Sequence, residues 1–308
     1  MPTFARRMGK VQRSFIREIL KVTEDPSIIS FAGGLPNPAF FPTAEIADAA
    51  SRVLAAEGPA ALQYATTEGF PPLRQWIADR YARRGLRVKP DEVLVLNGSQ
   101  QGLDLAAKIF LDPGDAVLVE RPTYLAALQA FGLFEPSFVS MTLRDDGPDA
   151  AEAAEAMARH MPRFCYAIPT FQNPSGISWS LNVRRQVAGL LASGPTVLIE
   201  DDPYGELRFA GEHLPFVASL MGEGAVSDCH AVLLGTFSKI VAPGLRLGWI
   251  CAGPEIMERL VVAKQAADLH SNGFAQRVIH RWLLDHDLEA HIARIREAYG
   301  RQRDLMVE

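Results

Sequence analysis

Short apolar runs that alternate with helical stretches constrain the fold of this chain more than any other feature of its sequence. Runs of this length, apolar throughout, are typical of strands in a mostly parallel sheet that helices cover on both faces. We therefore predict an α/β fold. Ligands bind such sheets at the carboxyl ends of the strands, so functional side chains are expected in the loops that follow the runs. The runs are Val93–Leu96, Ala116–Val119, Phe164–Ile168, Val197–Ile199, Ala231–Leu234 and Leu247–Ile250.

Charge and composition exclude several classes of protein. The net charge of −5 argues against a large nucleic-acid-binding surface, and we interpret Arg83, Arg84 and Arg87 as a solvated helix end. The three cysteines are widely spaced, which fits neither a disulfide framework nor a metal site and indicates a reducing compartment. No apolar stretch reaches the length of a membrane span, and no signal peptide is recognised. We expect a cytoplasmic protein with no metal ion and no membrane or nucleic-acid partner.

Two polar clusters follow predicted strands and could bind one phosphate group. The segment Gly98–Gln100 lies between a strand and a helix, where free backbone N–H groups and a hydroxyl point toward an anion. Taken alone, Ser99 could equally be an ordinary helix cap. Thr236, Ser238 and Arg246 add two hydroxyls and a guanidinium, which suit a second face of the same phosphate.

Lys239 and Asp201 are the candidates for covalent and proton chemistry. Lys239 follows a predicted buried strand, where partial desolvation lowers the pKa of an amine and lets it condense with an aldehyde. The alternative is a surface lysine. Asp201 ends another buried strand, so its carboxylate needs a cationic partner such as a protonated pyridine nitrogen, unless it caps the following turn. The adjacent acids Glu200 and Asp202 are interpreted as structural.

The two ends of the chain have simpler patterns. Phe4–Leu20 has apolar residues at helical spacing and is predicted to be an amphipathic helix. Ile28–Ala32 is predicted to be a short strand, and it runs into the glycine- and proline-rich bend Gly33–Pro38. The final segment, Leu288–Met306, is predicted to be a helix.

Together these residues resemble the motifs of the fold-type I pyridoxal-5′-phosphate (PLP)-dependent aminotransferases of class I and II, most closely the 2-aminoadipate and broad-specificity subgroup. The motifs occur in the family's order and spacing and cover most of the chain. The resemblance implies PLP as the cofactor and a large domain with a mostly parallel sheet flanked by helices. The matching motifs are Ser30–Pro36, Leu62–Gly69, Asn97–Gln101, Phe171–Gly176, Glu200–Tyr204 and Thr236–Arg246.

The resemblance also implies roles for individual residues around the cofactor ring. Lys239 resembles the lysine that holds PLP as a Schiff base and shuttles the proton, and Asp201 resembles the acid bound to the pyridine nitrogen. Asn173 and Tyr204 resemble the pair that hydrogen-bonds the phenolic oxygen, and Tyr204 is counted with Lys239 and Asp201 as catalytic. Tyr124 resembles the residue that stacks on the ring.

Further implied roles concern the phosphate, the neighbouring subunit and the substrate. Tyr64 resembles the tyrosine that reaches the phosphate of a second subunit, so a homodimer with shared active sites is expected. Gly34, through its backbone, and Asn173 resemble one anchor of the substrate carboxylate. Arg17 matches a substrate-contacting arginine of the subgroup's N-terminal helix, although a solvated helix arginine is the alternative. The residues that resemble the phosphate cup are Ser99, Gln100, Thr236, Ser238 and Arg246.

The sequence departs from the family at its C-terminal end. Members of the family continue into a small domain whose arginine binds the substrate's α-carboxylate, whereas this sequence stops within the last predicted helix. We therefore expect a C-terminally truncated chain that binds the cofactor but transaminates poorly. The expected domains are an N-terminal arm at 1–42, a large PLP-binding domain at 43–285 and the start of the small domain at 286–308.

The expected reaction is PLP-dependent transfer of an amino group between an L-amino acid and a 2-oxo acid, with glutamate and 2-oxoglutarate as one pair. Two alternatives remain open. A PLP-dependent lyase or decarboxylase has the same fold, because the reaction depends on which substrate bond stands perpendicular to the ring. A PLP-sensing domain of a transcription regulator is the second, but only about thirty residues precede Gly33, fewer than a winged helix needs.

Overall fold

The computed structural model describes residues 2–9, 27–28 and 34–308. Of the predicted N-terminal helix Phe4–Leu20, residues 4–9 fall within this part of the chain and include the 3₁₀ turn Arg6–Gly9. Most of the predicted strand Ile28–Ala32 and the candidate substrate residue Arg17 lie outside the described residues. The predictions for these segments therefore remain untested.

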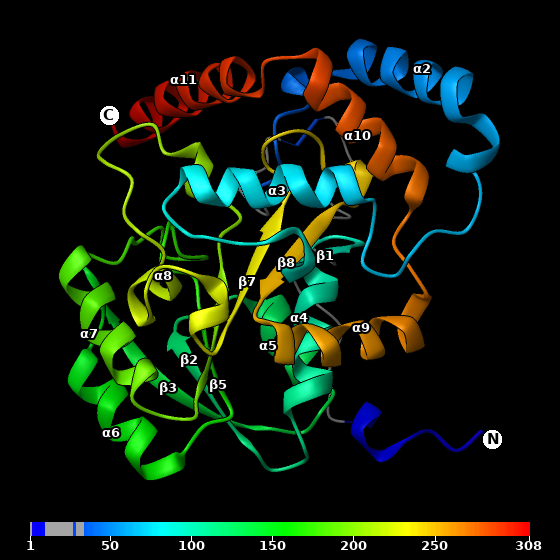
Figure 1. The fold of residues 1–308 in the computed structure, drawn as a ribbon. Coiled ribbons are helices and arrows are strands. Elements are labelled where there is room, and N and C mark those ends of the chain that lie inside the picture. Colours follow the sequence, from blue (N-terminus) through cyan, green and yellow to red (C-terminus); the bar gives the residue numbers. More distant parts are fainter. Residues whose placement is uncertain (1, 10–26, 29–33) are drawn as a thin grey trace.

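An eight-stranded sheet forms the centre of the described structure, with the order β1-β8-β7-β6-β5-β2-β3-β4 (Figure 1). All six apolar runs are strands, as predicted. The sequence pattern missed β3 and β4, because β3 alternates apolar and polar residues and its first residues are exposed. The strands are β1 (Val93–Leu96), β2 (Ala116–Arg121), β3 (Ser137–Arg144), β4 (Gly147–Pro148), β5 (Phe164–Ala167), β6 (Val197–Asp201), β7 (Ala231–Thr236) and β8 (Gly248–Ala252).

Strand direction decides which loops meet at one edge of the sheet. Strands β3, β2, β5, β6 and β7 are parallel, whereas β8 is antiparallel to both β7 and β1. Thr236, the last residue of β7, pairs with Gly248, the first residue of β8. Arg246 precedes its strand, and it nevertheless lies at the edge where the parallel strands end.

Helices cover both faces of the sheet, as the apolar runs predicted. Within β1, Val93 and Val95 belong to one apolar cluster, while Leu94 and Leu96 belong to the other. Helices α4, α5 and α9 pack on the face that carries Leu94 and Leu96, and the other described helices pack on the face that carries Val93 and Val95. Helices α6, α7 and α8 gather at one side in Figure 1. The helices are α2 (Thr43–Ala61), α3 (Pro71–Arg83), α4 (Ser99–Phe110), α5 (Leu125–Gly132), α6 (Ala150–His160), α7 (Leu181–Ala192), α8 (Val217–Met221), α9 (Pro254–Asp268), α10 (Gly273–Asp285) and α11 (Leu288–Val307). Within the described residues, no helix is both long enough and apolar enough to cross a membrane.

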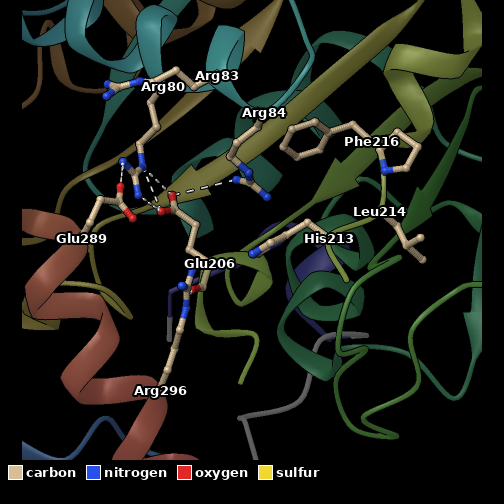
Figure 2. A pocket seen from close by; sticks show the side chains of 10 residues that line it. Arg80, Arg83, Arg84, Glu206, His213, Leu214, Phe216, Glu289 and Arg296 are labelled. Carbon is tan, nitrogen blue, oxygen red and sulfur yellow. Dashed lines mark hydrogen bonds and ion pairs between the residues drawn. The ribbon is translucent and has the colours of Figure 1, made fainter. Parts of the chain in front are cut away.

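A group of ion pairs joins α11 to the body of the molecule, beside a pocket of about 380 Å³ (Figure 2). Arg80 on α3 lies between Glu206, with which it forms a close ion pair, and Glu289 on α11, 2.7 Å away. Arg296 Nε donates to the backbone oxygen of Glu206 at 2.7 Å. The Arg80 side chain is only 10% exposed, so these partners, and not water, stabilise its positive charge. The pocket contains neither Lys239 nor Asp201.

Replacing Arg80 by alanine should lower the free energy of unfolding by ~2–4 kcal/mol, because it leaves the mostly buried Glu206 carboxylate without its main partner. The matched control is Arg301→Ala, which removes an i,i+4 pair with Glu297 on the exposed surface of α11. That variant should cost under ~0.5 kcal/mol. Chemical denaturation of both variants measures the difference, and equal losses would show that α11 does not depend on the Arg80 group.

Candidate active site

The carboxyl edge of the sheet brings together side chains from four separate strand ends. Asp201 is the last residue of β6, and Lys239 follows the end of β7 by three residues. Ser99 opens α4 after β1, and Asn173 lies in the loop after β5. The candidate residues that follow different strands in the sequence therefore share this edge, as the sequence analysis predicted.

Asp201 has one oxygen bound and one oxygen without a partner. Tyr166 donates its hydroxyl to Oδ2 at 2.9 Å, while Oδ1 is buried and has no hydrogen-bond partner among the described residues. Asp201 is 4% exposed, and burial raises the pKa of its carboxyl to about 7. A buried, unpartnered carboxylate oxygen is a costly arrangement that a bound N–H donor would relieve.

The neighbouring acids have structural partners, as the sequence analysis expected. Asp202 forms an ion pair with Arg84 at 2.7 Å and accepts a hydrogen bond from the Gly205 backbone. Asp202, and not Asp201, therefore caps the turn that follows β6. Glu200 accepts hydrogen bonds from the backbone N–H groups that begin α8, and burial raises its pKa to about 7.

Lys239 lies close to the tyrosine and asparagine that were predicted to face the cofactor. Its Nζ is 5.8 Å from the centre of the Tyr204 ring, and Asn173 Nδ2 donates to the Tyr204 hydroxyl at 3.4 Å. Burial lowers the pKa of Lys239, and the nearby Arg246 cation lowers it further. Both effects favour the neutral, nucleophilic amine, so this lysine is not the surface residue considered above.

The two clusters predicted to bind phosphate lie next to each other, where β1 ends and β8 begins. Gly98, with φ +85°, is the N-cap of α4, so Ser99 is not the cap. A Cβ added to Gly98 would lie 2.5 Å from Arg246 Nη2, and one added to Gly248 would lie 2.6 Å from the Ser99 backbone nitrogen. Thr236 Oγ1 donates to Ser238 Oγ at 2.9 Å. The two glycines therefore let the Arg246 guanidinium and the start of β8 pack closely against the turn into α4, which gathers N–H groups, hydroxyls and a guanidinium in one place.

Three other predicted residues have specific surroundings. The Gln100 side chain donates to the Ala126 carbonyl at 3.0 Å, so its backbone N–H is the group left for an anion. Tyr124 is the N-cap residue of α5, at the end of the loop after β2. Gly34 has a left-handed backbone with φ +51° in the segment before α2. Whether it meets Asn173 and a substrate carboxylate stays a prediction.

Tyr64 lies on the surface of the chain, next to His270. It is 81% exposed, and its ring contacts only the edge of His270 among the aromatic pairs, at 5.8 Å between centroids. Such exposure of a large aromatic residue is consistent with a contact to another chain.

The sequence analysis missed three residues that contact Asp201 or the loop that carries Asn173. Tyr166 lies inside an apolar strand run and was read only as core, although its hydroxyl binds Asp201. Arg208 stacks on Phe171 at 4.5 Å, next to the loop that carries Asn173. Arg184, almost fully buried, donates to the Pro169 carbonyl at 2.6 Å. A polar side chain inside an apolar helix or strand pattern was the signal that could have identified Tyr166 and Arg184.

Comparison with known proteins decides the family. The model of the class I and II aminotransferases matches residues 32–308. This chain belongs to the class I and II aminotransferases. The 2-aminoadipate transaminase of Thermus thermophilus is 42% identical over 304 residues, which are 99% of this chain and 75% of that protein. Aromatic-amino-acid aminotransferase 1 of Thermococcus litoralis is 40% identical over 99% of this chain and 73% of that protein.

Solved structures agree with the sequence comparison. The α-aminoadipate aminotransferase of Thermus thermophilus, in complex with N-(5′-phosphopyridoxyl)-L-leucine, matches with a TM-score of 0.90 and covers 99% of this chain and 75% of that one. The predicted fold-type I architecture is thereby confirmed. This aminotransferase uses PLP to transfer an amino group between an amino acid and a 2-oxo acid.

The residues present fit PLP. The unpartnered Asp201 Oδ1 suits a protonated ring nitrogen, and the amine of Lys239 suits the aldehyde. The N–H groups at the start of α4, the Thr236 and Ser238 hydroxyls and the Arg246 guanidinium suit the phosphate, and Gly98 and Gly248 allow these segments to pack this closely.

Proposed function

We propose that Lys239, Asp201 and Tyr204 carry out the transamination through one polar atom each, namely Nζ, Oδ1 and Oη. When bound, PLP supplies an aldehyde that condenses with amines and a ring that accepts electrons from the substrate's α-carbon. Lys239 Nζ would remove the substrate's α-proton and deliver it to the carbon of the former aldehyde, on the other side of the amino nitrogen. Asp201 Oδ1 holds the proton on the ring nitrogen. The single observation that carries the proposal is the buried Asp201 Oδ1 with no partner among the described residues.

Lys239 and its surroundings suit proton transfer. The lowered pKa increases the neutral fraction of the amine, and both condensation and proton removal require the neutral form. Asn173 donates to Tyr204 Oη, and burial raises the pKa of Tyr204 to about 12, so the tyrosine stays a donor near neutral pH. Tyr204 can therefore hydrogen-bond the phenolic oxygen of the cofactor, and Tyr124 can pack on its ring.

The phosphate is proposed to bind at the N-terminus of α4. Ser99 and the backbone N–H of Gln100 supply one side, and Thr236, Ser238 and Arg246 supply the other. A twelve-residue helix directs its free N–H groups and the positive end of its dipole at the anion. Arg246 adds a charge-assisted hydrogen bond.

We further propose that the substrates are glutamate or 2-aminoadipate and the matching 2-oxo acids, with Arg17 binding the side-chain carboxylate. The support is the name of the relative from Thermus thermophilus and the position of Arg17 in the N-terminal segment. Arg17→Ala should lower kcat/KM for 2-aminoadipate about 10- to 100-fold and that for leucine less than threefold, because only the acidic substrate loses an ion pair. Steady-state kinetics on both amino donors provide the check. Equal losses would mean that Arg17 does not select the side chain.

A homodimer with shared sites is the remaining proposal, supported by the 81% exposure of Tyr64. If Tyr64 of one chain completes the site of the other, a mixed dimer of Lys239→Ala and Tyr64→Ala chains holds one intact site. Doubly tagged mixed dimers should therefore bind one PLP per dimer with the parent affinity. Mixed dimers with no site of parent affinity would place Tyr64 in its own chain's site, and a monomer in sedimentation velocity would exclude the shared site altogether.

A further inference from the structure

A buried ion pair at the end of α9 has no part in the proposed chemistry. Lys264 is completely buried, and its Nζ contacts both oxygens of Asp268, at 2.6 and 2.7 Å. Burying a lysine is unfavourable unless its charge is paired, and burial indeed lowers the pKa of Lys264. The inference below rests on the proposed phosphate site.

The Asp268 carboxylate also binds the turn that leads into α4. Its Oδ2 accepts one hydrogen bond from Asn97 Nδ2 and another from Gln101 Nε2, both at 2.7 Å. The Asn97 backbone N–H in turn donates to Gln101 Oε1 at 2.9 Å. Residues on either side of Gly98 and Ser99 are thus held by one carboxylate from another helix.

The chain around Asp268 is held in a conformation that needs such support. Leu269 has φ +64° and ψ −62°, and the His270 N–H donates to the Asp268 carbonyl at 2.7 Å. This is a γ-turn with positive φ, which is strained for leucine and persists only where its surroundings fix it. Ser271 Oγ fixes the far side by donating to the Val95 carbonyl in β1 at 2.9 Å. The end of α9 and the residues after it therefore hold β1 through the Val95 carbonyl, and they hold the turn into α4 through Asn97 and Gln101.

We propose that Asp268 is a positioning residue for the phosphate of PLP. By holding Asn97 and Gln101, its carboxylate fixes the direction of the Ser99 and Gln100 N–H groups without touching the cofactor. Lys264 holds that carboxylate in place through its two contacts. A preformed set of donors binds an anion more tightly than one that must first be ordered.

The experiment compares PLP with pyridoxal, which lacks the phosphate. Lys264→Met is the reference, because it removes the buried cation and leaves both amide contacts of Asp268. In that background Asp268→Ala removes the acceptor without leaving a buried charge unpaired, whereas Asp268→Asn keeps an oxygen that can accept both bonds. Dissociation constants come from titrating the cofactor-free proteins, and thermal unfolding checks that each variant is folded.

Asp268→Ala should raise the Kd for PLP about 10- to 100-fold and that for pyridoxal less than threefold. Asp268→Asn should restore most of the PLP affinity. The matched control is Asp104→Ala, which removes an exposed i,i+4 pair with Lys108 on α4 and should leave both constants unchanged. An unchanged Kd for PLP, or an equal loss for PLP and pyridoxal, would overturn the proposal. Failure of the parent protein to attach PLP at Lys239 appears before any variant is made, and it would overturn this proposal together with the function on which it rests.

Discussion

Lys239→Ala should abolish transamination and the covalent attachment of PLP, a loss of at least ~10⁴-fold in turnover. The variant lacks both the amine that binds the aldehyde and the base that moves the α-proton. Turnover is measured with an amino donor and a 2-oxo acid. Attachment is measured by borohydride reduction followed by mass analysis of the peptides.

The matched control for this prediction is Lys108→Ala, which removes a half-exposed lysine on α4. That variant should keep the adduct and nearly full turnover. A reducible PLP adduct in Lys239→Ala would mean that another lysine holds the cofactor, and the assignment of the site would then be wrong.

Asp201→Asn should retain PLP but lower turnover by about 10³-fold. A neutral amide no longer keeps the ring nitrogen protonated, so the cofactor accepts electrons from the α-carbon less readily. Lys239 and the proposed phosphate site are unchanged in this variant, which is why binding should persist. Single-turnover absorbance measurements after mixing with an amino donor separate the slowed proton removal from binding.

The same substitution should have the opposite effect on the stability of the cofactor-free protein. Asp201 has a pKa of about 7 in the folded chain against 3.8 as a free side chain, so the folded state binds the extra proton between these values. The parent therefore loses stability as the pH rises through this window, and the loss is complete above about pH 7. Asparagine does not titrate. At pH 8 the variant should be more stable by up to ~4 kcal/mol, at about 1.4 kcal/mol per pKa unit, and the gain should vanish below pH 4.

Together, lower activity with higher stability would identify Asp201 as a group retained for catalysis at the expense of the fold. Denaturation at pH 4, 6 and 8 supplies the stability measurement. Turnover within about tenfold of the parent, a loss under ~1.4 kcal/mol, would remove the electron-accepting role from Asp201. Asp202 would be tested next, although Arg84 already neutralises it.

Particular residues show where sequence reasoning succeeded. The apolar runs predicted six strands and two covered faces, because burial on both sides of a strand leaves no polar position in it. The outer strand β3 escaped prediction, since one of its faces meets solvent and its pattern is mixed. Lys239 and Asp201 were predicted as candidates because a charged residue at or just past the end of a buried strand needs a partner or a chemical role.

The sequence by itself determined the α/β class, the family and the candidates for PLP binding, because these depend on local patterns and motif order. Only the tertiary structure decided that β8 runs antiparallel, which brings Arg246 to the edge where Lys239 lies. It also decided that Tyr166 binds one oxygen of Asp201 and leaves the other without a described partner. The position of Asp268, 171 residues from Asn97, likewise has no trace in the sequence pattern. Such contacts depend on strand direction and packing between distant segments, which side-chain periodicity along one segment does not encode.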